Sequence, residues 1–229
     1  HGLDLEMPCH ENRERTLFKA ANKGVLQKRA VDEEALHLAT LNVHLQDDRP
    51  VQKEAFNVGI SHQAALEMAE DSIVLAKNEG SLLPLKNLDD VCLIGALAKQ
   101  FRYQGAGSSK VVPHHLVTLY ESLNEGRNPT EEIKYEAGYP LETKENAKTL
   151  LLGALDLASS HKNVILCLGL PEGYESEGYD RRDMRLPDEQ YALVDALYSV
   201  NKNLIVVYLG GAPVEMPFAD KTPAIVLAY

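Results

Sequence analysis

Short apolar runs alternate with helical patterns along the second half of the chain. The clearest run, residues 163–170, is β-branched and continuously apolar, which is typical of a strand buried on both faces. The five strand candidates are residues 91–97, 133–137, 164–170, 204–209 and 224–228. Apolar residues recur at helical spacing in residues 117–123, 144–159 and 188–200. This alternation predicts an α/β fold: a three-layer α/β/α sandwich with a mostly parallel sheet.

The first third of the chain has a different pattern. Residues 1–8 predict a short strand ending in a turn, and residues 15–23 and 31–44 predict helices. Residues 46–60 carry charge, Pro and Gly with little periodicity, and we interpret them as a linker. A strong helix is expected over residues 62–77, capped by Ser61. Two helices and part of a strand cannot close a core, so the main folded body is expected at residues 61–229.

Composition narrows the classes of function. The net charge of −11 over 229 residues argues against a nucleic-acid partner, because phosphate backbones are bound chiefly by clustered Lys and Arg. No apolar run is long enough for a membrane span. The three cysteines, Cys9, Cys92 and Cys167, are too few for a disulfide framework and are expected to be reduced. These features favour a cytoplasmic protein, and both ends of the chain resemble cut ends, so a fragment is expected.

A carboxylate-rich segment follows the apolar run at residues 163–170, where open α/β sheets place their ligands. Crowded carboxylates raise one another's proton affinity and a neighbouring guanidinium lowers it, so one site can obtain both an acid and a base. The alternative is a solvated, salt-bridged surface loop, which is what most charge runs are. The segment's acidic residues are Glu172, Glu175, Glu177, Asp180 and Asp183.

A glycine-rich segment, residues 104–110, follows the strand candidate at 91–97. It lacks the Gly-Lys-Ser/Thr pattern of a phosphate loop, so a turn or a sugar-contact loop is favoured over a nucleotide cradle. His114-His115 and Cys9-His10 lack the spacing of metal ligands, and Gly-x-Ser-x-Gly is absent. The sequence therefore predicts neither a metal site nor a serine hydrolase.

Taken together, these motifs resemble glycoside hydrolase family three, the β-glucosidase and β-xylosidase family. Six segments occur in the family's order and at ordinary spacings. They are Gly-Leu-Asp-Leu-Glu-Met-Pro at residues 2–8, Ser-Ile-Val-Leu-Ala-Lys-Asn-Glu-Gly-Ser-Leu-Leu-Pro-Leu at 72–85, Gln-Gly-Ala-Gly-Ser-Ser at 104–109, Tyr-Glu-Ala-Gly-Tyr at 135–139, Glu-Gly-Tyr-Asp-Arg at 177–181 and Gly-Ala-Pro-Val-Glu-Met at 211–216. Ala106 departs mildly from the commoner Gln-Gly-Gly-Gly-Ser.

The resemblance implies an upstream (β/α)8-like barrel, a linker and an α/β sandwich. Residues 1–45 would then be a helical remnant of the barrel, 46–60 the linker and 61–229 the sandwich, truncated at its carboxyl end. The implied partners are a β-glucoside or oligosaccharide substrate and the missing N-terminal barrel domain. A homo-oligomer is also possible. No cofactor is implied, because retaining glycosidases need only two carboxyl groups about 5–5.5 Å apart.

The family's nucleophile is an Asp in a barrel motif that this chain lacks. The family's general acid/base is a Glu of the sandwich domain, and the resemblance assigns this role to Glu177. Glu175 is the alternative candidate. Asp180 and Arg181 are expected to hold the loop, by pairing with each other or with the 104–109 turn. The residues expected to contact substrate are Gln104, Gly105, Ser108, Tyr179 and Met7. Two other readings stay open: a non-catalytic carbohydrate-binding or assembly module, and a flavodoxin-like nucleotide or flavin binder by fold analogy alone.

Overall fold

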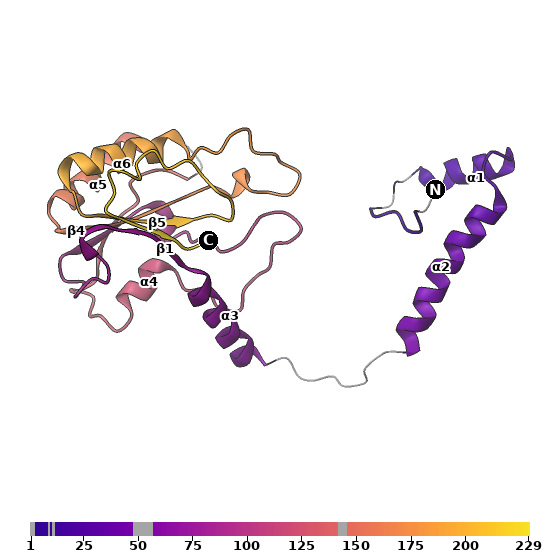
Figure 1. Cartoon of the computed structure of the whole chain (residues 1–229), viewed down its shortest axis with the longest axis horizontal. Helices are drawn as coiled ribbons and strands as arrows, with labels where there is room; N and C mark the ends of the chain where they lie inside the picture. Colours follow the sequence, from indigo (N-terminus) through magenta and orange to yellow (C-terminus); the bar gives the residue numbers. More distant parts are fainter. Residues whose placement is uncertain (1–2, 9, 11, 48–56, 142–145) are drawn as a thin grey trace. The chain divides into compact units, whose positions relative to one another are not determined.

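The computed structural model describes residues 3–8, 10, 12–47, 57–141 and 146–229. The chain divides into two units, His1–Phe56 and Asn57–Tyr229, which are described separately (Figure 1). The middle of the predicted linker, residues 48–56, lies outside the described residues. Residues 46–47 and 58–60 belong to helices, so the described ends of the predicted linker are helical. The boundaries at residues 45 and 61 stay a prediction.

The first unit contains α1 (Arg13–Asn22) and α2 (Lys28–Asp47), which confirms the two predicted helices. Ion pairs Lys28–Asp32 and Arg29–Glu33, spaced by four residues, join successive turns at the start of α2. The strand predicted over residues 1–8 is wrong for residues 3–8, which form no regular element, and residues 1–2 lie outside the described part. The described part of this unit contains no second strand that could pair with it.

Six strands of the second unit form one sheet in the order β1-β6-β5-β4-β2-β3. Every neighbouring pair is parallel except β1 and β6, which confirms the prediction of a mostly parallel sheet. The strands are β1 (Val74–Asn78), β2 (Val91–Ile94), β3 (Lys134–Glu136), β4 (Asn163–Gly169), β5 (Leu204–Leu209) and β6 (Ala224–Leu227).

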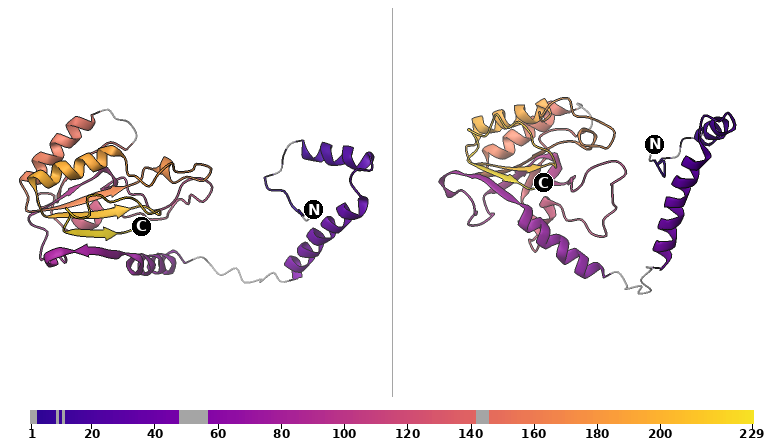
Figure 2. Two further views of the ribbon diagram at one scale, coloured as in Figure 1. Left: turned by 45° about the horizontal axis from the view of Figure 1, so that its top comes forward. Right: turned by 45° about the vertical axis from the view of Figure 1, so that its right-hand side comes forward.

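Helices cover both faces of this sheet, which gives the predicted three layers (Figure 1). The longer helices, α5 (Ala147–Ser159) and α6 (Asp188–Val200), lie side by side on one face (Figure 2). The short α4 (Leu119–Asn124) and the apolar residues of segment 82–88 pack on the other. Alternate residues of β4 enter the two cores: Leu166 and Leu168 face α5 and α6, and Ile165 and Cys167 face α4. Both faces of β4 are buried, which explains its continuous apolar sequence.

The helix predicted over residues 62–77 is wrong at both ends. The helix α3 (Val58–Ser72) begins earlier, where the Asn57 side chain accepts a hydrogen bond from the N–H of Ile60 at 3.2 Å, so Asn57 and not Ser61 is the cap. Residues 74–78 then form β1, because their backbone groups pair antiparallel with β6. The sequence pattern does not reveal this edge strand for two reasons. Its pairing partner lies about 150 residues away in the sequence. Its half-exposed side chains also fit the apolar stripe of a helix.

The predicted strand at residues 91–97 ends early, at Ile94. Gly95 has a φ of +121°, and a Cβ on it would lie 2.2 Å from the carbonyl oxygen of Cys167. Only glycine fits there, and the chain turns into the short helix η2 (Ala96–Ala98). This turn directs residues 99–118 over the carboxyl end of the sheet.

Burial also explains the cysteines. Cys92 and Cys167 are buried free thiols, and burial raises the pKa of each to about 12. They are core residues, as predicted, while Cys9 lies outside the described residues. No helix in the described part of the chain combines the length and the hydropathy needed to cross a bilayer.

Candidate active site at the carboxyl ends of the strands

Two loops meet at one edge of the sheet. The loop after β2 holds the glycine-rich segment and the loop after β4 holds the carboxylates; because β2 and β4 are parallel neighbours, both loops leave the same edge. The loops join in an isolated parallel bridge between Ala106 and Ser176. The Ala106 N–H donates to the carbonyl of Glu175 at 3.3 Å, and the Glu177 N–H donates to the carbonyl of Ala106 at 3.5 Å. The two predicted segments therefore form one site.

Ser108 binds the carboxylate of Glu177 directly. Its backbone N–H donates to Glu177 Oε2 at 3.1 Å, and its hydroxyl donates to the same oxygen. The hydroxyl bond and then the backbone bond hold the pKa of Glu177 below its ordinary value, because both stabilise the anion. Glu177 as a residue is exposed, and the two bonds from Ser108 are made to one of its two carboxylate oxygens.

Gly107 allows this close approach. Its φ is +91°, and a Cβ there would lie 2.7 Å from the Cβ of Glu177. Real Cβ atoms do not approach so closely, so any larger residue would separate the two loops. The glycine-rich segment thus serves loop packing beside Glu177.

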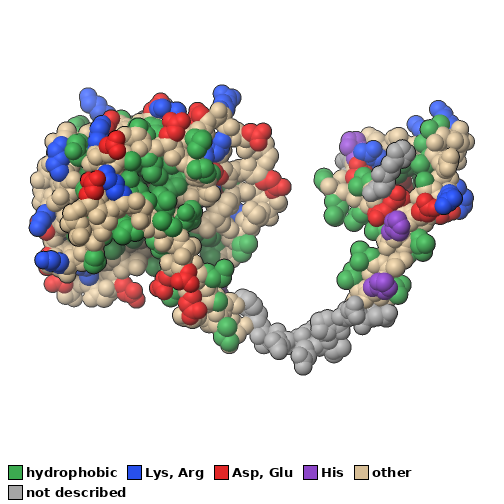
Figure 3. Space-filling view, viewed as in Figure 1, with side chains coloured by type: hydrophobic (Ala, Val, Ile, Leu, Met, Phe, Trp, Pro, Cys, Tyr) green, Lys and Arg blue, Asp and Glu red, His purple; other side chains and the backbone are tan. Residues whose placement is uncertain are grey.

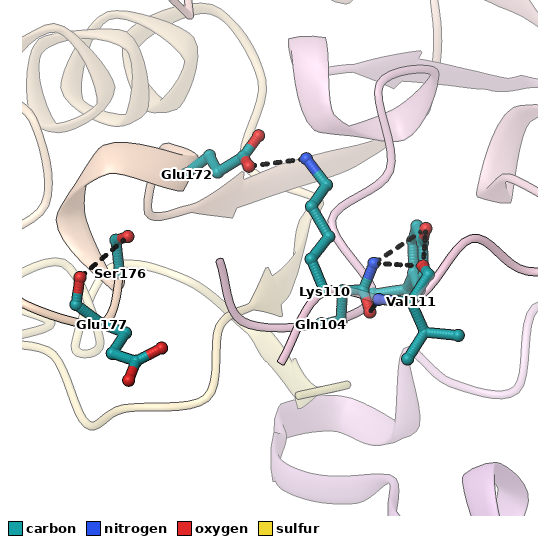
Figure 4. Close-up of polar contacts among 7 residues, drawn as sticks. Gln104, Lys110, Val111, Glu172, Ser176 and Glu177 are labelled. Carbon is teal, nitrogen blue, oxygen red and sulfur yellow. Dashed lines mark hydrogen bonds and ion pairs between the residues drawn. The ribbon is translucent and has the colours of Figure 1, made fainter. Parts of the chain in front are cut away.

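The other predicted substrate contacts lie in different surroundings. The Gln104 side chain is engaged by Val111: Nε2 donates to the Val111 carbonyl at 2.7 Å, and the Val111 N–H donates to Oε1 at 2.8 Å (Figure 4). Tyr179 is 74% exposed, and its N–H donates to the carbonyl of Ser176 at 3.2 Å. Met7 belongs to the first unit, where its side chain is 80% exposed.

A cavity of about 480 Å³ lies beside the bridge, at the carboxyl ends of the strands. Gly105 lines it, but Glu177 does not. Its volume is that of a small-molecule pocket. The lining residues are Arg102, Tyr103, Gln104, Gly105, Glu175, Gly210, Gly211, Ala212 and Tyr229.

Two ion pairs connect the loops. Arg102 pairs with Glu175 in nearly buried surroundings, and Lys110 pairs with Glu172 at 2.7 Å on the surface (Figure 4). The Lys110 ammonium lowers the pKa of Glu172, and the carboxylate raises the pKa of Lys110. The sequence analysis does not single out Arg102. The feature that could have identified it is its position: it is a positively charged residue just before the glycine-rich segment, and the carboxylate-rich segment offers it partners of opposite charge.

Arg181 holds the carboxylate loop, but by a different contact from the one predicted. Its Nη1 donates to the carbonyl of Pro213 at 3.1 Å, in the segment after β5. Among the described residues it pairs neither with Asp180 nor with the 104–109 turn. The glycine segment after β5 therefore belongs to the same edge of the sheet, because Gly210 and Gly211 also line the cavity.

His115, which lacks the sequence spacing of a metal ligand, lies in the same loop as the glycine-rich segment, after β2. The His115 ring stacks edge-on against His62, with centroids 5.9 Å apart. Asp4, Glu34 and His37 of the first unit bring one ligand atom each within 4.8 Å of one another, and His37 Nδ1 lies 3.1 Å from Asp4 Oδ1. This surface group does not include any residue of the two loops.

The fold and the site define the class of protein: an α/β sandwich in which the loops after two parallel strands bring a carboxylate, Glu177, to one edge of the sheet. Comparison with known families identifies it further: residues 73–229 match the glycosyl hydrolase family 3 C-terminal domain. The chain belongs to glycosyl hydrolase family 3. The match begins at the residue before β1, which agrees with the corrected strand assignment.

Individual relatives agree with this assignment. The whole chain is 35% identical to thermostable beta-glucosidase B of Acetivibrio thermocellus, of which it covers 30%. It is 28% identical to an exo-alpha-(1->6)-L-arabinopyranosidase of Bifidobacterium longum, covering 31% of that protein. The crystal structure of the Bifidobacterium adolescentis GH3 beta-glucosidase matches the whole chain with a TM-score of 0.82 at 29% identity, over 33% of its own length. The chain thus spans about a third of the length of these relatives.

Proposed function

We propose that this chain is the second-domain part of a retaining β-glycosidase and that Glu177 is its general acid/base. Glu177 would protonate the departing glycosidic oxygen and then deprotonate the water that resolves the glycosyl-enzyme. The nucleophile would be an Asp of a barrel domain that precedes this chain. The observation that carries the proposal is the exposed carboxylate of Glu177, held by Ser108 at the carboxyl ends of parallel strands.

The lowered pKa of Glu177 sets a condition for this role. A general acid must hold its proton near neutral pH, whereas the two bonds from Ser108 favour the anion. A second domain covering the exposed carboxyl would desolvate it, and the nucleophile would add a like charge; both effects raise the pKa. We therefore also propose that a preceding barrel domain covers Glu177.

Apolar residues on the first unit support a neighbouring domain. Hydrophobic side chains occur along the surface of this unit (Figure 3). On α2 the large exposed ones are Val31, Leu36, Leu41, Val43 and Leu45. Apolar surface of this kind is typical of a helix that packs against another element. We propose that α1 and α2 are the end of the barrel domain.

We propose a terminal non-reducing β-D-glycosyl residue as the substrate. The names of the relatives support a small sugar at this site, and they include both glucosidases and an arabinopyranosidase. The residues proposed to line the sugar or its leaving group are Gln104, Gly105, Ser108, Tyr179 and Met7. For Gln104 the engaged amide favours an indirect role through the shape of the loop.

The experiment that tests this role is azide rescue of Glu177→Ala in the full-length enzyme, with an activated aryl β-glucoside. A good leaving group needs no protonation, so the variant should form the glycosyl-enzyme but hydrolyse it slowly, about 10²–10⁴-fold below wild type. Azide should restore turnover and give a glycosyl azide product, because it attacks without a base. Near-normal activity with no effect of azide would contradict the proposal and make Glu175 the next candidate.

A further inference from the structure

The two ion pairs between the loops differ sharply in burial. The side chains of Arg102 and Glu175 are 11% and 12% exposed, whereas those of Lys110 and Glu172 are 53% and 61% exposed. An exposed pair is screened by solvent and holds two flexible side chains weakly. A nearly buried pair is screened far less, so it constrains the two loops more strongly.

The buried pair also has a second anchor. Arg102 Nη1 donates to the carbonyl of Leu170 at 3.0 Å, at the first residue after β4, and the same guanidinium pairs with the Glu175 carboxylate. One arginine therefore holds the loop at its start and again two residues before Glu177. Both contacts are made by the same nitrogen, Nη1 of Arg102.

The buried Tyr208 is influenced by the same charges. Burial, followed by the charge of Glu175, raises the pKa of Tyr208 to about 12. Its neutral hydroxyl donates to the carbonyl of Ala212 at 2.7 Å, and only 4% of the residue is exposed. Both carboxylate oxygens of Glu175 and the Nε of Arg102 are buried without a hydrogen bond among the described residues, so the ion pair is the main compensation for burying these two charges.

We propose that Arg102 and Glu175 are positioning residues for Glu177: their ion pair holds the Ala106–Ser176 bridge in register and so keeps Ser108 on the Glu177 carboxylate. This inference rests on the proposed role of Glu177. Glu175 supports the bridge directly as well, because its own carbonyl accepts the Ala106 N–H. The exposed Lys110–Glu172 pair spans the same loops but does not hold the register.

The test is an NMR titration of the Glu177 carboxyl group in this chain, comparing wild type with Glu175→Gln and with the matched control Glu172→Gln. Two effects have opposite signs. Removing a neighbouring negative charge lowers the pKa of Glu177, whereas losing the bonds from Ser108 raises it. We expect the pKa to rise toward its ordinary value in Glu175→Gln and not to rise in Glu172→Gln.

Ser108→Ala is the reference variant, because it removes the hydroxyl bond to Glu177 and so shows how far the pKa of Glu177 rises when that bond is lost. The amide NMR spectrum reports whether each variant is folded. If Glu175→Gln does not fold, the double variant Arg102→Met/Glu175→Met removes both charges without leaving one unpaired, and the same rise is expected. An unchanged or lowered pKa of Glu177 in a folded variant, with a rise in Ser108→Ala, would overturn the proposal.

Kinetics of the full-length enzyme give the second readout. A displaced acid/base should reduce kcat/KM for an unactivated glucoside by about 10²-fold in Glu175→Gln and leave it near wild type in Glu172→Gln. Equal losses in both variants would overturn the proposal. Failure of the proposed function can be distinguished from failure of this inference. If Glu177 is not the acid/base, azide does not rescue Glu177→Ala, but the titration of this chain still reports the contact between Ser108 and Glu177.

Discussion

At the scale of residues, Ser108 provides two hydrogen bonds to one oxygen of Glu177. A backbone N–H and a hydroxyl from the same residue approach the carboxylate together, so they fix its direction as well as its charge. The geometry therefore favours an ionised Glu177 whenever no second domain covers it. Hydrogen bonds to a charged group are stronger than those between neutral groups.

Replacing Ser108 with Ala should change the pH dependence of stability. The folded-state pKa of Glu177 is below its unfolded value, so the contact stabilises the fold above the unfolded pKa, and this stabilisation is lost as pH falls through the folded pKa. We expect the variant to be less stable than wild type near neutral pH and equal to it in acid. Urea unfolding across that pH range measures the difference.

Ser109→Ala is the control for this experiment. Among the described residues its hydroxyl has no hydrogen bond to Glu177, so its stability relative to wild type should not vary with pH. A pH-independent deficit in Ser108→Ala would mean that the hydroxyl contributes through packing and that its bond to Glu177 is not made in solution.

At the scale of elements, the sequence pattern predicts those strands that are buried on both faces. Residues 204–209 and 188–200 were placed without error, because continuous apolar character and helical spacing are local signals. β1 was not found, because its identity depends on antiparallel pairing with β6 at the end of the chain. The end of β2 was missed for a similar reason: Gly95 is required by the distant carbonyl of Cys167.

The site shows the same division between local and distant information. The sequence motifs predict which two loops form the site. The contact between Ser108 and Glu177 agrees with that prediction, because each residue lies in one of the two motifs. The bridge at Ala106 and the ion pair of Arg102 depend on how two loops about 70 residues apart pack together, and no local pattern reports this. The same is true of Arg181, whose partner Pro213 lies on a third loop.

The approach of the two loops predicts a large difference between neighbouring glycines. Gly107→Ala should destabilise the chain by about 1–3 kcal/mol, because alanine is strained at φ +91° and its Cβ would lie 2.7 Å from that of Glu177. A Cβ on Gly105 would meet nothing closer than Ser109 Oγ at 3.8 Å, without a positive φ, so Gly105→Ala should be near neutral. Urea unfolding compares them, and equal effects would contradict the close approach.

At the scale of the whole molecule, the proposed function divides the active site between this chain and a preceding domain. The chain spans about a third of the length of its relatives, and the first unit exposes apolar helix surface. The proposed chemistry needs two carboxyl groups about 5–5.5 Å apart, and the proposed nucleophile is not in this chain.

The chain by itself should therefore show no glycoside hydrolysis. Glu177 alone can donate or accept a proton but cannot form the glycosyl-enzyme, so purified chain incubated with an aryl β-glucoside should release no more product than buffer. Activity that Glu177→Gln abolishes would contradict this division of the active site. The alternative function is a non-catalytic carbohydrate-binding module, and titration calorimetry with glucose on the same sample tests it. Such a module needs no second carboxylate, so glucose binding by the isolated chain that is unchanged in Glu177→Gln would favour this alternative.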